Sequence, residues 1–123
     1  MDHSKRQVEC VIPVLPVREL KRSISFYTDI LGFKLDWSGD SVCSVSRDSC
    51  AIMLSAAVKP AGAAWVWIGL EDDSLFAEFQ KRGVKVRQEP LNHSWAWEMN
   101  FRDPDGNVLW LGTEPKKDLP FVE

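Results

Sequence analysis

Phe101-Arg102-Asp103-Pro104-Asp105-Gly106-Asn107-Val108-Leu109-Trp110-Leu111 reads as two strands joined by a tight acidic turn. Pro104 presets the φ angle of a turn and Gly106 supplies a positive φ, while the aspartates accept hydrogen bonds from nearby backbone. Apolar residues on both sides of the turn are typical of strands. This stretch therefore predicts a β-hairpin near the end of the chain.

The first half of the chain predicts one helix and up to four strands. Leu20, Ile24, Tyr27 and Leu31 recur at helical spacing over residues 19–31, and Gly32 follows as a C-cap. Strands are expected at residues 33–37, 41–47 and 50–55, the last two joined by a tight Asp48-Ser49 turn. Residues 8–15 are rich in β-formers, but Pro13 and Pro16 cannot donate ladder hydrogen bonds, so this segment is an edge strand, a bend or an exchanged strand.

The second half repeats this plan, with a strand at residues 64–70, a helix at 73–82 and a strand at 84–87 before the hairpin. Leu31-Gly32-Phe33-Lys34-Leu35 matches Arg82-Gly83-Val84-Lys85-Val86, and Arg47-Asp48 matches Arg102-Asp103. Because neither half buries its sheet alone, the duplication predicts an α+β fold. We expect one domain over residues 1–123, in which two βαβββ modules, about 8–56 and 63–113, pair into a curved eight-stranded mixed sheet with the helices outside.

Composition excludes several classes of protein. The chain has 123 residues, a formal net charge of −3 and 45% hydrophobic residues, which fits one globular domain and argues against nucleic acid as a partner. No apolar run is long enough for a membrane span, and no apolar region follows the charged residues 1–6, so a cytoplasmic protein is expected. Cys10, Cys43 and Cys50 form no Cys-x-x-Cys pair, which argues against a disulfide framework and a thiolate zinc site.

Together with Phe26-Tyr27-Thr28-Asp29-Ile30-Leu31-Gly32-Phe33, the hairpin resembles the vicinal oxygen chelate superfamily of glyoxalases, extradiol dioxygenases and bleomycin resistance proteins, over about residues 8–114. In the metal-dependent members, the resemblance places metal ligands on the first and last strands of each module. Those positions fall here at Ile12, Met53, Ala64 or Trp65, and Trp110, and none of these side chains suits a divalent metal ion. We therefore expect no metal centre and no cofactor.

Catalytic motifs are also missing from the sequence. It contains no Gly-x-Ser-x-Gly, His-Glu-x-x-His, Walker or dinucleotide-binding pattern. His3 lies in the N-terminal tail, and His93 can either pair with Glu98 as a base with its orienting carboxylate or lie exposed in a loop. Cys43 and Cys50 have no basic neighbour at a spacing that would favour a thiolate, so both are expected to pack as small apolar residues. No catalytic residue is assigned.

Six tryptophans are unusual in a chain of this length. Trp65 and Trp67 are two residues apart on a predicted strand and leave the same face, and Trp95 and Trp97 repeat that spacing before the next long strand. Trp37 ends the strand that follows Leu-Gly-Phe. Such rings either fill a core or line a surface that stacks on a flat ligand and attracts cations. The acidic neighbours of these tryptophans, Asp36, Asp40 and Glu98, are the candidate counter-charges.

The sequence is most similar to the bleomycin resistance branch of the superfamily. The matching stretches are residues 11–19, Ala64-Trp65-Val66-Trp67, residues 75–79, and Trp95 before the hairpin. The resemblance implies a homodimer in which the first strand is exchanged around its proline. It also implies a groove between subunits, where aromatic side chains corresponding to Trp37, Trp65 and Trp95 sandwich the flat part of a cationic glycopeptide. Val42 replaces an aromatic residue of that branch, so the identity of the ligand stays open.

The sequence is compatible with three candidate functions. The first is metal-free, non-catalytic sequestration of a flat, cationic small molecule in aromatic clefts of a homodimer. The second is a superfamily enzyme with a non-standard site, a lyase or isomerase using His93 and Glu98. The third is a sensor or accessory domain whose dimer interface is the functional surface. The first is the prediction that we carry forward.

Overall fold

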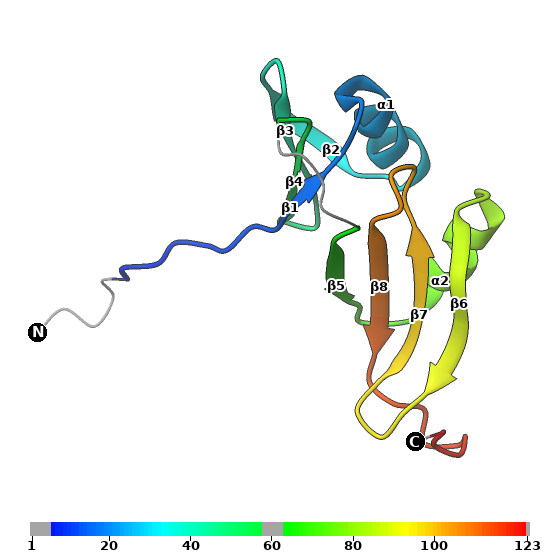
Figure 1. The fold of residues 1–123 in the computed structure, drawn as a ribbon. Coiled ribbons are helices and arrows are strands. Elements are labelled where there is room, and N and C mark those ends of the chain that lie inside the picture. Colours follow the sequence, from blue (N-terminus) through cyan, green and yellow to red (C-terminus); the bar gives the residue numbers. More distant parts are fainter. Residues whose placement is uncertain (1–5, 58–62, 123) are drawn as a thin grey trace, which may run out of the picture.

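The computed structural model describes residues 6–57 and 63–122 (Figure 1). Its elements are, in chain order, β1 (Val14–Pro16), α1 (Leu20–Ser25), a π-helical turn η1 (Phe26–Ile30), β2 (Lys34–Ser38), β3 (Val42–Arg47), β4 (Cys50–Ser55), β5 (Trp65–Gly69), α2 (Ser74–Lys81), β6 (Lys85–Asn92), β7 (Trp97–Arg102) and β8 (Val108–Thr113). No helix among the described residues has the length and apolar character needed to cross a bilayer. His3 and most of the predicted boundary between the modules lie outside the described residues.

The strands form two four-stranded sheets of the same topology, β1-β4-β3-β2 and β5-β8-β7-β6. In each sheet the first strand pairs in parallel with the last, while the other pairs are antiparallel. The α+β class and the duplicated βαβββ modules are thus confirmed. The eight predicted strands are divided between two sheets, and one buried apolar cluster contains side chains from both, including Val45 and Leu54 of the first and Met99 and Leu111 of the second.

The first strand is short, as expected from Pro13 and Pro16, which cannot donate ladder hydrogen bonds. Only Val14–Pro16 pairs with β4, and the preceding residues 6–11 are exposed. Figure 1 shows this N-terminal segment leading away from both sheets as an extended arm. Because the arm leaves Val8 and Val11 67% and 88% exposed, its apolar side chains are available to another surface.

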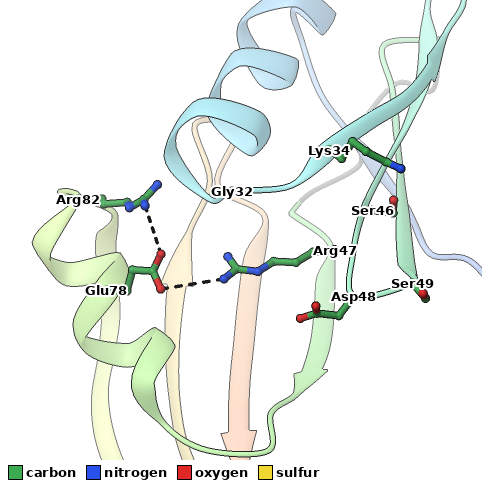
Figure 2. Close-up of a pocket in the computed structure, with 8 residues that line it drawn as sticks. All are labelled: Gly32, Lys34, Ser46, Arg47, Asp48, Ser49, Glu78 and Arg82. Carbon is green, nitrogen blue, oxygen red and sulfur yellow. Dashed lines mark ion pairs between the residues drawn. The ribbon is translucent and has the colours of Figure 1, made fainter.

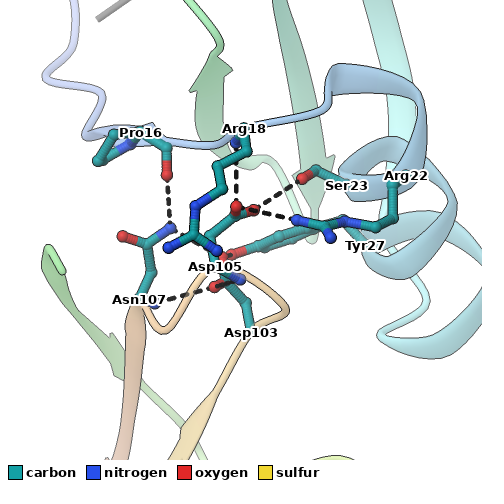
Figure 3. A network of polar contacts seen from close by, with 8 residues as sticks. All are labelled: Pro16, Arg18, Arg22, Ser23, Tyr27, Asp103, Asp105 and Asn107. Carbon is teal, nitrogen blue, oxygen red and sulfur yellow. Dashed lines mark hydrogen bonds and ion pairs between the residues drawn. The ribbon is translucent and has the colours of Figure 1, made fainter. Parts of the chain in front are cut away.

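The acidic turn of the β7–β8 hairpin joins the second module to the first (Figure 3). Asp105 accepts hydrogen bonds from the Arg18 backbone N–H (3.0 Å) and from Arg22 (2.9 Å), both of the first module. Asn107 donates to the Pro16 carbonyl (2.8 Å), and the buried Tyr27 hydroxyl donates to Asp103 (2.9 Å). The turn is therefore more than a local reversal, because it anchors α1, η1 and β1.

Burial raises the pKa of Tyr27 well above its usual value, with the nearby charge of Asp103 and its hydrogen bond adding to the effect. The unfolded chain releases this proton near pH 10, while the folded chain retains it. The contribution of Tyr27 to the free energy of unfolding is therefore fully present below about pH 10 and is lost as the pH rises above it. We expect Tyr27→Phe to lower the free energy of unfolding at pH 7 by about 1–2 kcal/mol. Between about pH 9 and 11 the variant should lose less stability than the wild type does.

Urea denaturation across this pH range measures both effects. Tyr27 is the chain's single tyrosine, so tyrosinate absorbance provides an independent readout. Ionisation of the folded protein near pH 10, as for a free tyrosine, would contradict the burial of this hydroxyl.

Candidate ligand-binding face

Four tryptophans gather on the side of the second sheet that faces away from α2. Trp65 and Trp67 alternate with Val66 along β5, and Trp67 is opposite Trp110 in the parallel pairing with β8. The Trp110 ring stands perpendicular to the other three, with centroid separations of 4.9 Å to Trp67 and 5.8 Å to both Trp65 and Trp95. We call Trp65, Trp67, Trp95 and Trp110 the tryptophan face.

These rings remain open to solvent although they contact one another. Trp65 is 50% exposed, Trp67 44% and Trp95 54%, while Trp110 lies between them, half-buried. Perpendicular packing at these separations is favourable for aromatic rings and leaves ring surface uncovered. Large rings held in place yet exposed are typical of a surface that stacks on a ligand.

Gly112 provides the space that the Trp67 ring occupies. A Cβ atom at Gly112 would lie 2.1 Å from the tip of that ring, so any side chain would displace it. Gly69, on the same strand as Trp67, would place its Cβ at 3.3 Å from the indole nitrogen. A small residue on β8 is therefore required for Trp67 to lie across the sheet beside Trp110.

Beneath the rings lies a buried carboxylate. Glu98, on β7, is 3% exposed, and its Oε1 accepts the indole N–H of Trp110 at 2.7 Å. Its Oε2 accepts from Gln88 at 2.7 Å and lies 2.9 Å from Nε2 of His93. The pair of His93 and Glu98 that the sequence allowed is thus formed, and the His93 ring stacks on Trp95 with a centroid separation of 4.7 Å.

One cation of the chain already lies on this face. The Arg87 guanidinium is 4.6 Å from the centre of the Trp65 ring and donates a hydrogen bond to Asn100 at 3.2 Å. This is the geometry of a cation–π contact. The exposed Trp65 ring thus packs against a guanidinium group of the chain itself.

Trp97 is separated from the other rings by the sheet itself. It begins β7, whereas Trp95 lies in the preceding loop, so the alternation rule for strands does not relate their directions. Trp97 stacks on Phe76 of α2 at 6.2 Å and donates its indole N–H to Asp73 at 3.0 Å. The predicted shared wall of Trp95 and Trp97 is thus not formed.

The remaining predicted residues lie on the first sheet. Trp37 is 48% exposed on β2, opposite Ser44 of β3. Asp36 accepts a hydrogen bond from Ser46 at 2.8 Å, and Asp40 is exposed in the following turn. Among the described residues, no ring contact joins Trp37 to the tryptophan face. Within a single chain, Trp37 is therefore separate from that face.

The positions for which the resemblance implied metal ligands carry side chains that lack hard donor atoms. Met53 faces Val14 across β1 and β4, and Trp110 is the corresponding residue on β8. Thioether and indole groups do not suit hard or borderline divalent ions. Across residues 6–57 and 63–122, no three His, Cys, Asp or Glu side chains are grouped closely enough to hold a metal ion.

Sequence reasoning missed Trp110 and Arg87 as members of this surface. Trp110 occupies a position at which the resemblance implied a metal ligand, where the first and last strands of the module meet. The same convergence predicts its contact with Trp67. Arg87 gave no comparable indication, because its contact with Trp65 spans residues that no local pattern relates.

Two cavities lie near these elements. The first, about 520 Å³, follows the edge of β5 between the N-terminal arm and the start of β4, and Trp67, Cys10 and Cys50 border it together with apolar side chains. The second, about 670 Å³, is polar and is shown in Figure 2. Its Arg47 and Arg82 donate to the carbonyls of Leu31 and Ile30 at 2.6 and 3.1 Å, so both cations already brace the end of the first helix.

Comparisons with known proteins identify relatives over most of the chain. Residues 7–111 match the family model of the Glyoxalase/Bleomycin resistance protein/Dioxygenase superfamily. A bleomycin resistance protein of Geobacillus stearothermophilus is 31% identical over a match of length 121, with coverage of 80% of this chain and 91% of that protein.

Two solved structures share the fold over most of the chain. TnmS3, an antibiotic binding protein from a Streptomyces species, is 27% identical, with a TM-score of 0.75 and coverage of 91% and 100% of the two chains. The bleomycin-binding protein of the bleomycin-producing Streptomyces verticillus, solved with copper(II)-bleomycin, is 23% identical, with a TM-score of 0.73 and the same coverage.

Fold and site together define a protein of two paired βαβββ modules with an exposed aromatic surface on the second sheet. The chain belongs to the glyoxalase, bleomycin resistance protein and dioxygenase superfamily.

Proposed function

We propose that this protein sequesters a flat, cationic small molecule by binding it on the tryptophan face, without changing it chemically. The observation that carries the proposal is the set of four ordered, partly exposed tryptophan rings at the convergence of β5 and β8. Stacking and cation–π contacts there contribute about 0.5–2 kcal/mol each. The names of the relatives, bleomycin resistance protein and antibiotic binding protein, support a drug or a drug-like natural product as the ligand.

The complete cleft is proposed to form in a homodimer. One copy would contribute the tryptophan face, and the second would contribute Trp37 with Asp36 and Asp40 as counter-charges. Val14, Leu35 and Trp37 expose apolar surface on the first sheet, and the N-terminal segment leads away from it as an extended arm (Figure 1), which would cross to the second subunit around Pro13. The sequence predicts a cytoplasmic setting for this binding.

A second candidate, a lyase or isomerase, is favoured by the 2.9 Å contact between His93 and Glu98. A base oriented by a carboxylate is the arrangement that proton abstraction needs. Both oxygens of Glu98, however, already accept hydrogen bonds that organise the tryptophan face. The binding function uses all of these contacts, and so it is the conclusion that we prefer. Turnover that is lost in His93→Ala would favour the enzyme instead.

Titration of intrinsic tryptophan fluorescence tests the binding proposal. We expect saturable quenching by metal-free bleomycin or by another flat cationic compound in a broad panel. Trp65→Ala should weaken this binding about tenfold because it removes one stacking surface. Trp97→Phe is the matched control, since that ring lies on the other side of the sheet, and it should bind as the wild type does.

Arg87→Gln tests the charge of the ligand in the same titration. The guanidinium competes with a ligand cation for the Trp65 ring, so its removal should tighten the binding of a cation and weaken that of an anion. Absence of quenching across the panel, or an equal response in Trp65→Ala and wild type, would contradict binding on the tryptophan face.

A further inference from the structure

The tryptophan face converges on one side chain, the buried carboxylate of Glu98. Three hydrogen-bond partners reach it from different parts of the second module: Trp110 from β8, Gln88 from β6, and His93 from the loop that follows β6. The His93 backbone N–H also donates to the Ala96 carbonyl at 2.8 Å, which closes the loop that carries Trp95. Glu98 thus contacts both Trp110, the central ring, and His93, which begins the loop that carries Trp95.

Through two of these partners the carboxylate is linked to every ring of the tryptophan face. Trp110 is bound directly and is itself in perpendicular contact with Trp65, Trp67 and Trp95. Trp95 is supported a second time, by the His93 ring stacked at 4.7 Å and 9° from parallel. If Glu98 stops accepting these hydrogen bonds, the central ring and the loop ring lose their fixed positions together.

The indole N–H of Trp110 requires an acceptor at Glu98. An indole N–H and a side-chain amide NH₂ are donors, and neither can be satisfied by another donor. Glutamine has nearly the shape of glutamate, but its single carbonyl oxygen is a neutral and weaker acceptor, while its NH₂ group can donate to the carbonyl of a turned Gln88 or to a neutral His93. The neutral isostere therefore weakens the hydrogen bond from Trp110, or loses it where the NH₂ group faces that ring.

Burial also keeps Glu98 from direct contact with a ligand. Its side chain is 4% exposed beneath the rings, so a bound cation has no direct path to its oxygens. A ligand instead meets ring surfaces that the carboxylate has already fixed. Such pre-organisation improves affinity because less side-chain freedom is lost on binding.

We propose that Glu98 is the positioning residue of the tryptophan face: by accepting hydrogen bonds from Trp110 and His93, it holds the rings in the arrangement that a flat ligand requires. This role replaces that of a counter-charge in direct contact with the ligand. The part of the proposal that concerns affinity rests on the proposed function, while the ordering of the rings is a property of the free protein.

The first measurement uses the free protein and Glu98→Gln. Indole N–H exchange with solvent is followed by ¹⁵N NMR, in which each tryptophan gives its own resonance. We expect the Trp110 indole proton to exchange about tenfold faster in the variant, because its buried hydrogen bond to a charged acceptor is weakened or lost. We also expect a weaker near-ultraviolet circular dichroism signal from the coupled rings.

Asp73→Asn is the matched control. Asp73 accepts the indole N–H of Trp97 at 3.0 Å on the opposite side of the sheet, so this substitution makes the same chemical change to another tryptophan. It should leave exchange at Trp110 unaltered. Unchanged exchange at Trp110 in Glu98→Gln would overturn the positioning role, whether or not any ligand is known.

The second measurement is affinity for metal-free bleomycin, or for whichever panel compound quenches the wild type. Glu98→Gln should bind about tenfold more weakly, and Asp73→Asn within twofold of wild type. If no compound binds wild type, the proposed function fails while the exchange measurement still decides the role of Glu98. If Glu98→Gln does not fold, Trp110→Phe cuts the same hydrogen bond from the other side, and wild-type affinity in that variant would contradict the proposal.

Discussion

Replacing Asp103 with alanine is expected to lower the free energy of unfolding by about 3–5 kcal/mol, the largest effect on stability that we predict for a single side chain. Asp103 is 5% exposed and accepts four hydrogen bonds. Two come from backbone N–H groups of the turn, at Asp105 and Asn107, and two from side chains, at Tyr27 and Asn107, all at 2.9 Å. Alanine leaves all four donors unpaired, most of them away from solvent.

The structural consequence extends beyond the hairpin. Because the turn holds α1 and β1 through Asp105 and Asn107, its loss loosens the junction between modules (Figure 3). Urea denaturation measures the change, and Asp48→Asn is the control, since Asp48 matches Asp103 in the internal repeat but is exposed. A loss below about 1 kcal/mol in Asp103→Ala, within the range of an ordinary surface substitution, would contradict this account of the junction.

Replacing Gly112 with alanine is expected to weaken ligand binding on the order of a hundredfold while changing stability by less than about 1 kcal/mol. The added Cβ would lie 2.1 Å from the tip of the Trp67 ring, so that ring must leave its place. It then loses its contacts with Trp110 and Trp95, and the ligand loses a stacking surface. Stability changes little because Trp67 is 44% exposed and can swing into solvent.

Gly69→Ala provides a graded comparison for this prediction. Its Cβ would meet the Trp67 indole nitrogen at 3.3 Å, which requires only a small shift of the ring. Calorimetric affinities for the same ligand should therefore decrease from wild type to Gly69→Ala and further to Gly112→Ala. Wild-type affinity in Gly112→Ala would show that the position of Trp67 does not matter for binding.

The elements that sequence reasoning placed correctly have local causes. Gly32 and Gly106 have positive φ angles of 77° and 82°, as a C-cap and a turn require, and β4 occupies the predicted residues 50–55. In contrast, β6 continues to Asn92, well beyond the predicted end at residue 87. The longer strand includes Pro90, whose missing N–H is tolerated because β6 lies at the edge of its sheet and its pairing is irregular.

The site was predictable where strand alternation governs it and unpredictable where tertiary contacts do. Alternation placed Trp65 and Trp67 on one face, as the structure has them. It did not apply to Trp95, which lies in a loop, and so it could not relate that ring to Trp97. The depth of Glu98 beneath the rings follows from three partners on separate elements, which no pattern in the sequence brings together.

The account depends on the tryptophan face being the surface that binds a flat cation. Its most direct test follows the six indole N–H resonances by ¹⁵N NMR while metal-free bleomycin, or the compound that quenches fluorescence, is titrated into the protein. We predict saturable shifts at Trp65, Trp67, Trp95 and Trp110, with Trp97 unmoved. Shifts at Trp97 alone, or no shift at the four face resonances while the ligand binds, would contradict the account.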